Sequence, residues 1–199
     1  MFTSTGWVAC FRRPCRRKHV GRPLMTMKFK TLKHFNDPGH AHELTFSCYK
    51  NNHTFDSDAL CQMLVNSIDR ARDRHCFKLL AYVIMPDHVH MTTFPMKPEY
   101  NISRILSGVK LSSSMKILRQ ISSKEDRPYA RLWQRGGGYD RNLVSREAVV
   151  ASIQYIHANP VRKGFVKTPD EWYWSSAGYY AGHNRYPIKV DDEILASLL

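Results

Sequence analysis

Long apolar runs are what this sequence most clearly lacks. The longest uninterrupted one, Leu79 to Met85, is much shorter than the about 18 residues of a membrane-spanning helix. Internal repeats and low-complexity tracts are also absent, which excludes coiled-coil and collagen-like proteins. The chain has 199 residues, of which 43% are hydrophobic and 12% aromatic. This length and composition predict one globular domain and no membrane partner.

Signals for cysteine pairing are missing as well. The five cysteines are odd in number, and no two of them form a Cys-x-x-Cys pair. The N-terminal segment has no apolar core of about 7–15 residues and therefore does not have the pattern of a secretory signal. Free thiols in a reducing compartment are the simplest interpretation, and we expect a cytoplasmic protein.

Acidic residues are absent from the first thirty positions. Residues 1–30 contain eight Lys and Arg and contribute +8 of the net charge of +13, so +5 remains for the rest of the chain. This mildly basic remainder favours a polyanionic partner such as nucleic acid. The basic start fits a transit peptide, a nucleic-acid-binding arm, or an extension upstream of a start at Met25 or Met27. We expect residues 1–38 to be a basic, disordered extension and residues 39–199 to be the folded domain.

The folded part shows a regular order of expected strands and helices. Strands are expected over residues 42–49, 77–85 and 88–94, with another short strand within 131–144. Helices are expected to begin at Asp56 or Ser57, to run from 102 to about 119, and to run from Ser145 to about Asn159, where Pro160 disfavours continuation. Residues 122–128 are expected to form a polar loop. This order predicts an α+β fold with a ferredoxin-like (RRM-like) antiparallel sheet and helices packed on it.

A first candidate for chemistry is the triplet His88-Val89-His90, which follows the buried strand and a Pro-Asp turn. Residues i and i+2 of a strand share one face, so both imidazoles project together. Two imidazoles on one strand form part of a divalent-metal site with open positions. The pattern alone has low specificity, since His40-Ala41-His42 repeats it.

A second candidate is Tyr155. The helix that carries it has an apolar stripe formed by Val149, Ile153 and Ile156, and Tyr155 lies about 120° from the centre of that stripe. Asn159 follows one turn later, so its amide oxygen is a candidate metal ligand. Two alternatives stay open: a tyrosine that extends its hydroxyl to water, and an asparagine that ends a helix.

These candidates combine into one kind of chemistry. Forming the phenolate of a free tyrosine at pH 7 costs about 4 kcal/mol, because its pKa is about 10. A nearby divalent ion or base offsets this cost, and the ion also polarises a phosphodiester oxygen. A His-x-His metal site that faces a helix-borne tyrosine is therefore suited to cutting a nucleic-acid strand through a covalent tyrosine–phosphate bond.

The stretch from Tyr82 to His90, which reads YVIMPDHVH, resembles the signature of single-tyrosine HUH transposases. Within that group the chain is similar to the REP-associated tyrosine transposases over residues 39–181. Three further segments agree in order: 132–141 with its Trp-Gln and Tyr-Asp pairs, 155–162 with the tyrosine, and 172–176, which reads WYWSS. Four ordered segments are far more specific than one His-x-His triplet.

The resemblance implies an HUH endonuclease fold and a role for each matched residue. Tyr155 would attack the scissile phosphate of single-stranded DNA next to a hairpin and form a 5′-phosphotyrosine. His88, His90 and Asn159 would hold Mg²⁺ or Mn²⁺, with no small-molecule cofactor. The protein would act as a monomer or homodimer. The expected DNA-binding residues are Lys110, Trp133, Gln134, Tyr139, Arg141, Arg162 and Lys163. A solvated basic face is the alternative for the cations, and a buried structural role is the alternative for Trp133 and Tyr139.

The sequence departs from the family pattern at one point. The triplet Gly136-Gly137-Gly138 inserts one residue relative to the family segment, which leaves the role of Tyr139 open.

A histidine-triad hydrolase would need a histidine at position 92, which is Thr92, and a two-histidine phosphodiesterase would need a second His-x-Thr motif. A non-catalytic hairpin-DNA-binding or RNA-binding module of ferredoxin-like fold stays open, and it would tolerate Tyr155→Phe.

Overall fold

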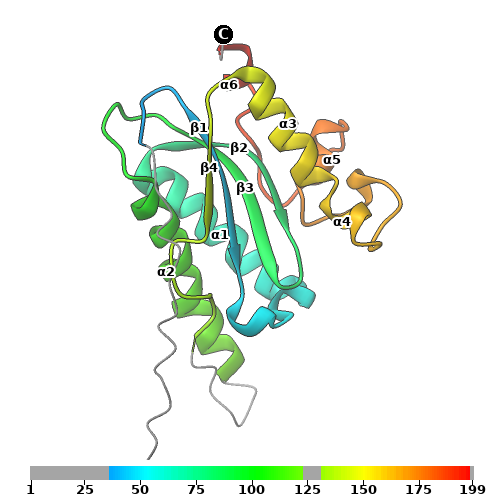
Figure 1. Ribbon diagram of the computed structural model, residues 1–199. Helices are drawn as coiled ribbons and strands as arrows, with labels where there is room; N and C mark the ends of the chain where they lie inside the picture. The colour runs from blue at the N-terminus through cyan, green and yellow to red at the C-terminus, as the bar shows by residue number, and fades with distance from the viewer. Residues whose placement is uncertain (1–35, 123–130, 198–199) are drawn as a thin grey trace, which may run out of the picture. The chain divides into compact units, whose positions relative to one another are not determined.

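The computed structural model describes residues 36–122 and 131–197 (Figure 1). Its centre is an antiparallel sheet of four strands in the order β2-β3-β1-β4. The strands are β1 (Ala41–Ser47), β2 (Phe77–Ile84), β3 (His88–Pro95) and β4 (Tyr139–Leu143). One helix connects β1 to β2 and another connects β3 to β4, which is the ferredoxin-like topology. The predicted α+β fold class is therefore confirmed.

Parts of two predictions lie outside the described residues. These are the basic extension up to residue 35 and the polar loop over 123–128. Within the described ranges, none of the helices has both the length and the apolar character needed to cross a bilayer.

Two long helices, α1 (Asp58–His75) and α2 (Ile102–Ser122), cover one face of the sheet (Figure 1). Both follow the predicted apolar spacing, since Leu64 and Ile68 of α1 and Val109 of α2 are fully buried. They pack against alternate strand residues, and these are Leu44, Phe46, Val89 and Met91. This layer contains the larger hydrophobic core of the protein.

The opposite face of the sheet is covered by α3 (Arg146–His157). The side chain of Ser145 begins this helix by accepting a hydrogen bond from the Ala148 amide at 3.2 Å, as expected for an N-cap. Val149, Ile153 and Ile156 are buried against the sheet, so the predicted apolar stripe is confirmed. The sheet is thus a central layer with both faces covered.

Burial on both faces explains the continuous apolar run in β2. A register irregularity lies between Leu79 and Ala81, where the extra residue Leu80 interrupts the pairing with β3. Leu79 packs into the core under α1 and α2, whereas Leu80 and Ala81 pack under α3. Tyr82 and Ile84 then return to the first core. This bulge shifts the alternation by one residue and lets each core receive bulky side chains.

The end of α3 differs from the prediction. The helix ends at His157, two residues before Asn159, and a short helix α4 (Asn159–Arg162) follows at once. Pro160 lies in the first turn of α4, where proline is tolerated because its missing N–H would have no partner within the helix. The proline therefore starts a new turn instead of ending helical structure altogether.

The segment from Trp172 to Ser176 covers the outer edge of β2. Ile84 N–H donates to Trp174 O at 2.8 Å, and Ser176 N–H donates to Tyr82 O at 3.0 Å. The indole of Trp172 adds a hydrogen bond to Ile84 O at 3.0 Å. This pairing protects an edge that would otherwise expose unpaired backbone groups. The remaining short elements are η1 (Tyr49–Asn51), η2 (Thr54–Asp56), η3 (Pro169–Glu171), α5 (Ala177–Tyr180) and α6 (Ile194–Ser197).

A buried histidine joins this edge segment to α3. His157 Nε2 lies 2.7 Å from the hydroxyl of Ser176, which also accepts a hydrogen bond from the Tyr82 amide. Burial lowers the pKa of His157 to about 4, because desolvation disfavours the charged ring. His157 is therefore neutral near pH 7 and links the end of α3 to the sheet.

We expect His157 to make folding stability depend on pH. Its folded pKa of about 4 lies below the ordinary value of 6.5, so the unfolded chain binds a proton first as the pH falls. The contribution to stability is therefore full above pH 6.5 and is lost as the pH falls toward 4. Urea unfolding at about pH 7 and about pH 5 should show a loss of about 2 kcal/mol from this group.

The matched comparison uses His157→Gln and, as control, His53→Gln at a histidine whose side chain is 63% exposed. His157→Gln should lose less stability on acidification than the wild type, and His53→Gln should lose as much. Equal losses in all three proteins would contradict the assignment.

Candidate active site

The alternation of β3 brings its two histidines to the face that α3 covers. Val89 and Met91 point into the core under α1 and α2, so His88 and His90 point to the opposite face. The two ring centroids lie 4.9 Å apart with an interplanar angle of 83°. The structure therefore places both imidazoles of the predicted triplet together, with His88 the more exposed ring.

Each of the two rings is held at its Nδ1 atom. His90 Nδ1 lies 2.8 Å from the hydroxyl of Thr45 on β1, and His88 Nδ1 is hydrogen bonded to the Asp87 carboxylate. Because a carboxylate only accepts, His88 donates its Nδ1–H to Asp87. Burial, followed by the nearby charge of His88, lowers the pKa of His90 to about 4. Both Nε2 atoms remain as candidate metal ligands on oriented rings.

Tyr155 reaches the histidines from α3. Its ring meets the His90 ring edge-on, with centroids 6.0 Å apart and an interplanar angle of 87°. The ring is 44% exposed, so it also faces solvent. The guanidinium of Arg162, from the end of α4, lies over this ring at 4.9 Å from the centroid. Tyr155, which lies outside the apolar stripe of α3, thus faces the histidine pair.

Asn159 is buried at the start of α4, with 6% of its surface exposed. Its amide nitrogen donates to the carbonyls of Tyr155 and Ile156 at 3.0 and 3.3 Å. Carbonyl oxygens only accept, so this end of the amide must be the NH₂ group. Within the described ranges no hydrogen bond reaches the other end, Oδ1. The amide nitrogen therefore caps the end of α3, and the amide oxygen is left for a ligand.

The candidate donors are the two imidazoles on β3 and the amide oxygen of Asn159 at the start of α4. Neutral imidazole and amide oxygen are ligands that divalent ions accept, and the Nδ1 bonds to Thr45 and Asp87 are the supporting contacts that such ligands have in metal sites. In the part of the chain that the structure describes, this site included, no three His, Cys, Asp or Glu side chains gather to hold a metal.

Trp133 has a structural role. Its ring is only 5% exposed, contacts Phe46 edge-on and Phe55 in a stack, and donates its indole N–H to Ser113 at 3.0 Å. No face of this ring is open to an unpaired base. The prediction that Trp133 stacks on DNA is therefore wrong for this structure, because the ring completes the core between β1 and α2.

Lys110, another predicted DNA contact, is bound to a loop. Its ammonium donates to the carbonyls of Gln134 and Gly136 at 3.1 and 2.9 Å. Burial lowers its pKa. Two of its three donors are thus used to hold the glycine-rich loop against α2, which is a structural function that sequence reasoning did not foresee.

The glycine triplet forms a bulge opposite β1. Residues 132–134 pair with the end of β1, where Gln134 N–H donates to Ser47 O at 2.9 Å. β4 then resumes the pairing with Tyr139 opposite Thr45, so residues 135–138 lie opposite the single residue Phe46. Gly138 has a φ of +75°, and a Cβ there would lie 2.4 Å from Thr45 O. Only glycine fits beside the residue that holds His90.

The same bulge returns Tyr139 to the site. Tyr139 pairs with Thr45, and Thr45 pairs with His90, so these side chains lie in one row across the α3-facing side of the sheet. Tyr139 is 50% exposed. The next row holds Arg141, whose side chain is 52% exposed, and Glu43. Gln134, Arg162 and Lys163 are also exposed, and their DNA-binding roles stay predictions.

Glu43 is a residue that sequence reasoning missed. It is 4% exposed, and its Oε2 atom has no hydrogen-bond partner among the described residues. The closest cation is Arg141, with 3.7 Å between Nη1 and Oε2. Because Glu43 pairs with Thr92 and not with His90, the sequence pattern gave no sign that it would lie one row from the histidines.

A second polar cluster fixes β4 from the other side of the sheet. His42 on β1 is fully buried, and its Nδ1 lies 2.8 Å from the Asp140 carboxylate. Its Nε2 lies 2.8 Å from the hydroxyl of Tyr100, just before α2. Asp140 therefore holds β4 through His42, while its neighbours Tyr139 and Arg141 point to the α3-facing side.

Comparison with known proteins gives a consistent result. The sequence matches the family model described as "Transposase IS200 like" over residues 38–159. A REP-associated tyrosine transposase bound to a REP hairpin superposes with a TM-score of 0.65 at 17% identity, covering 82% of this chain and 93% of that one. A transposase candidate from Deinococcus radiodurans R1 gives 0.44 at 21% identity, over 58% and 85%. No protein with a curated description matches significantly. The first superposition shows a shared fold.

The two positive-φ glycines of the bulge provide a matched test. Gly136 has a φ of +95° with nothing within 4 Å of an added Cβ, whereas an added Cβ at Gly138 meets Thr45 O. Gly136→Ala should cost about 1 kcal/mol of unfolding free energy, from backbone strain alone. Gly138→Ala should cost about 3 kcal/mol, because the clash adds to the strain. Urea unfolding of both variants measures the difference, and equal costs would argue against a close approach.

Proposed function

This chain belongs to the family of IS200-like transposases, whose model it matches over more than half of its length, and from that premise we propose that it cuts and rejoins single-stranded DNA through Tyr155. Membership of the family makes it a DNA-processing enzyme. The observation that carries the finer proposal is the edge-on contact between Tyr155 and His90. It joins the candidate nucleophile and the candidate metal ligands in one half-open site.

The proposed reaction is a transesterification. The Tyr155 Oη attacks the scissile phosphorus, the bond from phosphorus to the 3′ oxygen breaks, and the phenolic proton ends on the released 3′-hydroxyl. The products are a 5′-phosphotyrosine and a free 3′ end. The number of phosphate ester bonds is unchanged, so attack by another 3′-hydroxyl on the phosphotyrosine rejoins DNA and frees the tyrosine.

His88, His90 and Asn159 would hold Mg²⁺ or Mn²⁺, and the bound ion would polarise a non-bridging phosphate oxygen and stabilise developing charge. The chain's own side chains orient the ligand rings and place charge beside the tyrosine. Thr45 and Asp87 orient the rings, and burial keeps His90 unprotonated. Arg162 places a positive charge over Tyr155, where the scissile phosphate must come.

The proposed substrate is a single strand next to a hairpin. The structural relative that shares this fold is bound to a REP hairpin, which supports the proposal. Tyr139 and Arg141 lie on β4, and Gln134 lies opposite the end of β1. Arg162 and Lys163 lie at the end of α4. Phosphate contacts by the cations would be salt-sensitive and independent of sequence, whereas Tyr139 offers a ring for base stacking.

The test uses purified protein, Mn²⁺ and labelled single-stranded oligonucleotides that tile both strands around its own gene. We expect a covalent protein–DNA band on a denaturing gel, lost in Tyr155→Phe, in His88→Ala and after chelation of the metal. Tyr173→Phe is the matched control, since Tyr173 is 48% exposed and lies away from the histidines on the edge segment. It should leave the band unchanged.

A band that survives Tyr155→Phe would rule out the proposed nucleophile. If the wild type forms no band with any oligonucleotide but binds a hairpin tightly, the protein is a non-catalytic hairpin-binding module. RNA hairpins in the same binding assay separate the DNA-binding from the RNA-binding form of that alternative.

Thr45 provides a separate test of the metal site. Thr45→Val keeps the shape of the side chain but removes the hydroxyl that holds His90 Nδ1, and Thr45→Ser keeps the hydroxyl. We expect the Mn²⁺ affinity, measured by titration calorimetry, to fall about 10-fold or more in Thr45→Val and to change little in Thr45→Ser. Unchanged affinity in Thr45→Val would mean that this contact does not support a metal ligand.

A further inference from the structure

An exposed aromatic ring lies at the end of α4, beyond Tyr155. It belongs to Phe165, of which 48% is exposed. The ring packs on the indole of Trp172, with centroids 5.4 Å apart and an interplanar angle of 36°. Among the described residues, Trp172 is the one ring that Phe165 contacts. Phe165 therefore presents an uncovered flat surface to solvent.

Trp172 fixes this pair of rings to the scaffold of the candidate site. Its indole N–H donates to Ile84 O at 3.0 Å. Its ring also packs on three buried apolar side chains, which are Val83, Met85 and Ile156. Ile156 directly follows Tyr155 in α3, so the pair lies on the side of the sheet that carries the histidines. The two rings are thus held by the same elements that hold the site.

A tight turn sets the position of Phe165 after α4. Gly164 has a φ of +75°, and its N–H donates to Val161 O at 2.9 Å. Phe165 N–H then donates to Pro160 O, also at 2.9 Å. Pro160 follows Tyr155 by five residues. At about 1.5 Å per residue this is a helical path of roughly 7–8 Å, or the rise of about two stacked nucleotides.

Three exposed cations surround this turn, and they are Arg162, Lys163 and Lys167. Among the described residues, no carboxylate forms an ion pair with them. The two acids of the segment are used otherwise: Asp170 pairs with His183, and Glu171 accepts from the backbone amides of residues 167 and 168. Cations that attract phosphates, combined with a flat ring on which a base can stack, are typical of surfaces that bind single-stranded nucleic acid.

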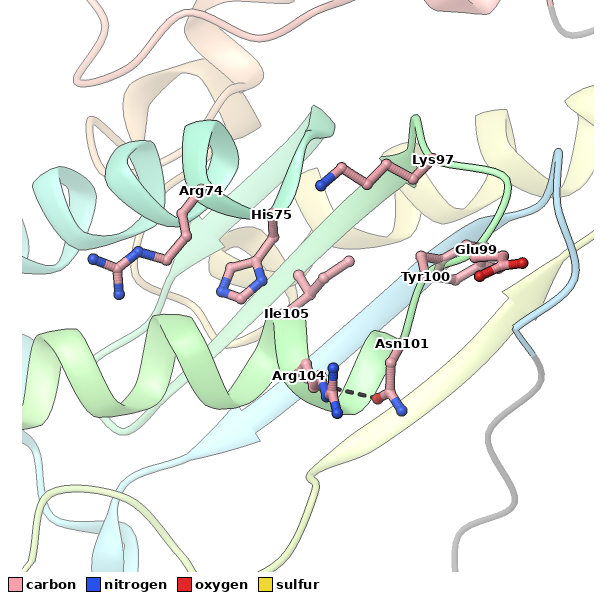
Figure 2. A pocket seen from close by; sticks show the side chains of 8 residues that line it. All are labelled: Arg74, His75, Lys97, Glu99, Tyr100, Asn101, Arg104 and Ile105. Atoms are coloured by element: carbon pink, nitrogen blue, oxygen red, sulfur yellow. Dashed lines mark hydrogen bonds between the residues drawn. The ribbon is translucent and has the colours of Figure 1, made fainter.

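The cavity in Figure 2 shows cations without such a ring. It lies between α1 and α2, on the other side of the sheet. Its cations include Arg74, Lys97 and Arg104. The phenol ring of that cavity, Tyr100, is held at its hydroxyl by hydrogen bonds to His42 and to the Asp37 carbonyl. Phe165 has no polar group to be held in this way, and an apolar ring that is half exposed gains free energy when a base covers it.

Phe165 and Tyr139 lie on opposite sides of the histidine pair. Tyr139 is on β4 at one edge of the sheet, and Trp172 covers β2 at the other edge. The strand of the histidine pair, β3, lies between these edges. A DNA strand that crosses the sheet with its scissile phosphate at Tyr155 therefore has one exposed ring available on each side.

We propose that Phe165 stacks on an unpaired base about two nucleotides from the phosphate that Tyr155 attacks. The inference rests on the proposed function, because it takes the cut strand as the ligand. Stacking uses the flat face of the base and does not read its identity. Phe165 is thus a positioning residue that holds the strand at the site, and Arg162 and Lys163 bind the phosphates between the stacked base and the cut.

The test removes the base and the ring separately. A strand that the protein cuts is synthesised with an abasic site at one position at a time on either side of the cut. Binding is measured in a Tyr155→Phe background, in which the strand stays intact. We expect one position, about two nucleotides from the cut, at which loss of the base raises the Kd about 5-fold or more.

Phe165→Leu keeps an apolar side chain against Trp172 but removes the flat ring. In the same background its Kd for the complete strand should rise about 5-fold or more, and the abasic site should cause no further rise, because ring and base act as one pair. Phe165→Tyr keeps the ring and should bind as Phe165 does.

The matched control is Tyr173→Leu. Tyr173 is also 48% exposed, but its ring packs on Trp174 and not on Trp172. This variant should keep both the affinity for the complete strand and the response to the abasic site.

Two results would overturn the inference while the proposed function stands. One is a wild type that cuts the strand although no abasic position weakens binding. The other is a Phe165→Leu variant that responds to the abasic site as fully as Phe165 does, which would give the ring a role in folding alone. A wild type that neither cuts nor binds any strand would instead contradict the proposed function, and the inference with it.

Discussion

The hydrogen bond between Thr45 and His90 is the contact on which the candidate site depends. It joins the two central strands of the sheet and is the one side-chain hydrogen bond of the buried His90 ring among the described residues. The backbone of Thr45 is in turn approached so closely by Gly138 that no side chain fits there. One residue in the middle of β1 therefore links the strand of the histidine pair, the glycine bulge and the row that contains Tyr139.

Much of this architecture could be predicted from the sequence because local patterns decide it. The apolar stripes predicted α1, α2 and α3, and the turn at Pro86-Asp87 predicted the β2–β3 hairpin. The displaced position of Tyr155 also followed from helical spacing alone. The histidine triplet needed only strand alternation to share a face. These features depend on residues within a few positions of one another.

The remaining features depend on contacts between distant segments. Thr45 and Glu43 join the site through strand pairing, which no local pattern specifies. The sequence left both a DNA contact and a structural role open for Trp133, which completes the core, and it gave no sign that Lys110 holds a loop. The end of α3 was placed two residues too late, because a proline that disfavours one helix also suits the first turn of the next.

The fixing of β4 from the far side of the sheet has a consequence for how this protein can diversify. Asp140 and His42 hold the strand through one face, whereas Tyr139 and Arg141 occupy the other. Exchanging the outward residues leaves the buried anchor intact. The surface that β4 presents beside the histidine pair can therefore change while the strand keeps its place in the sheet.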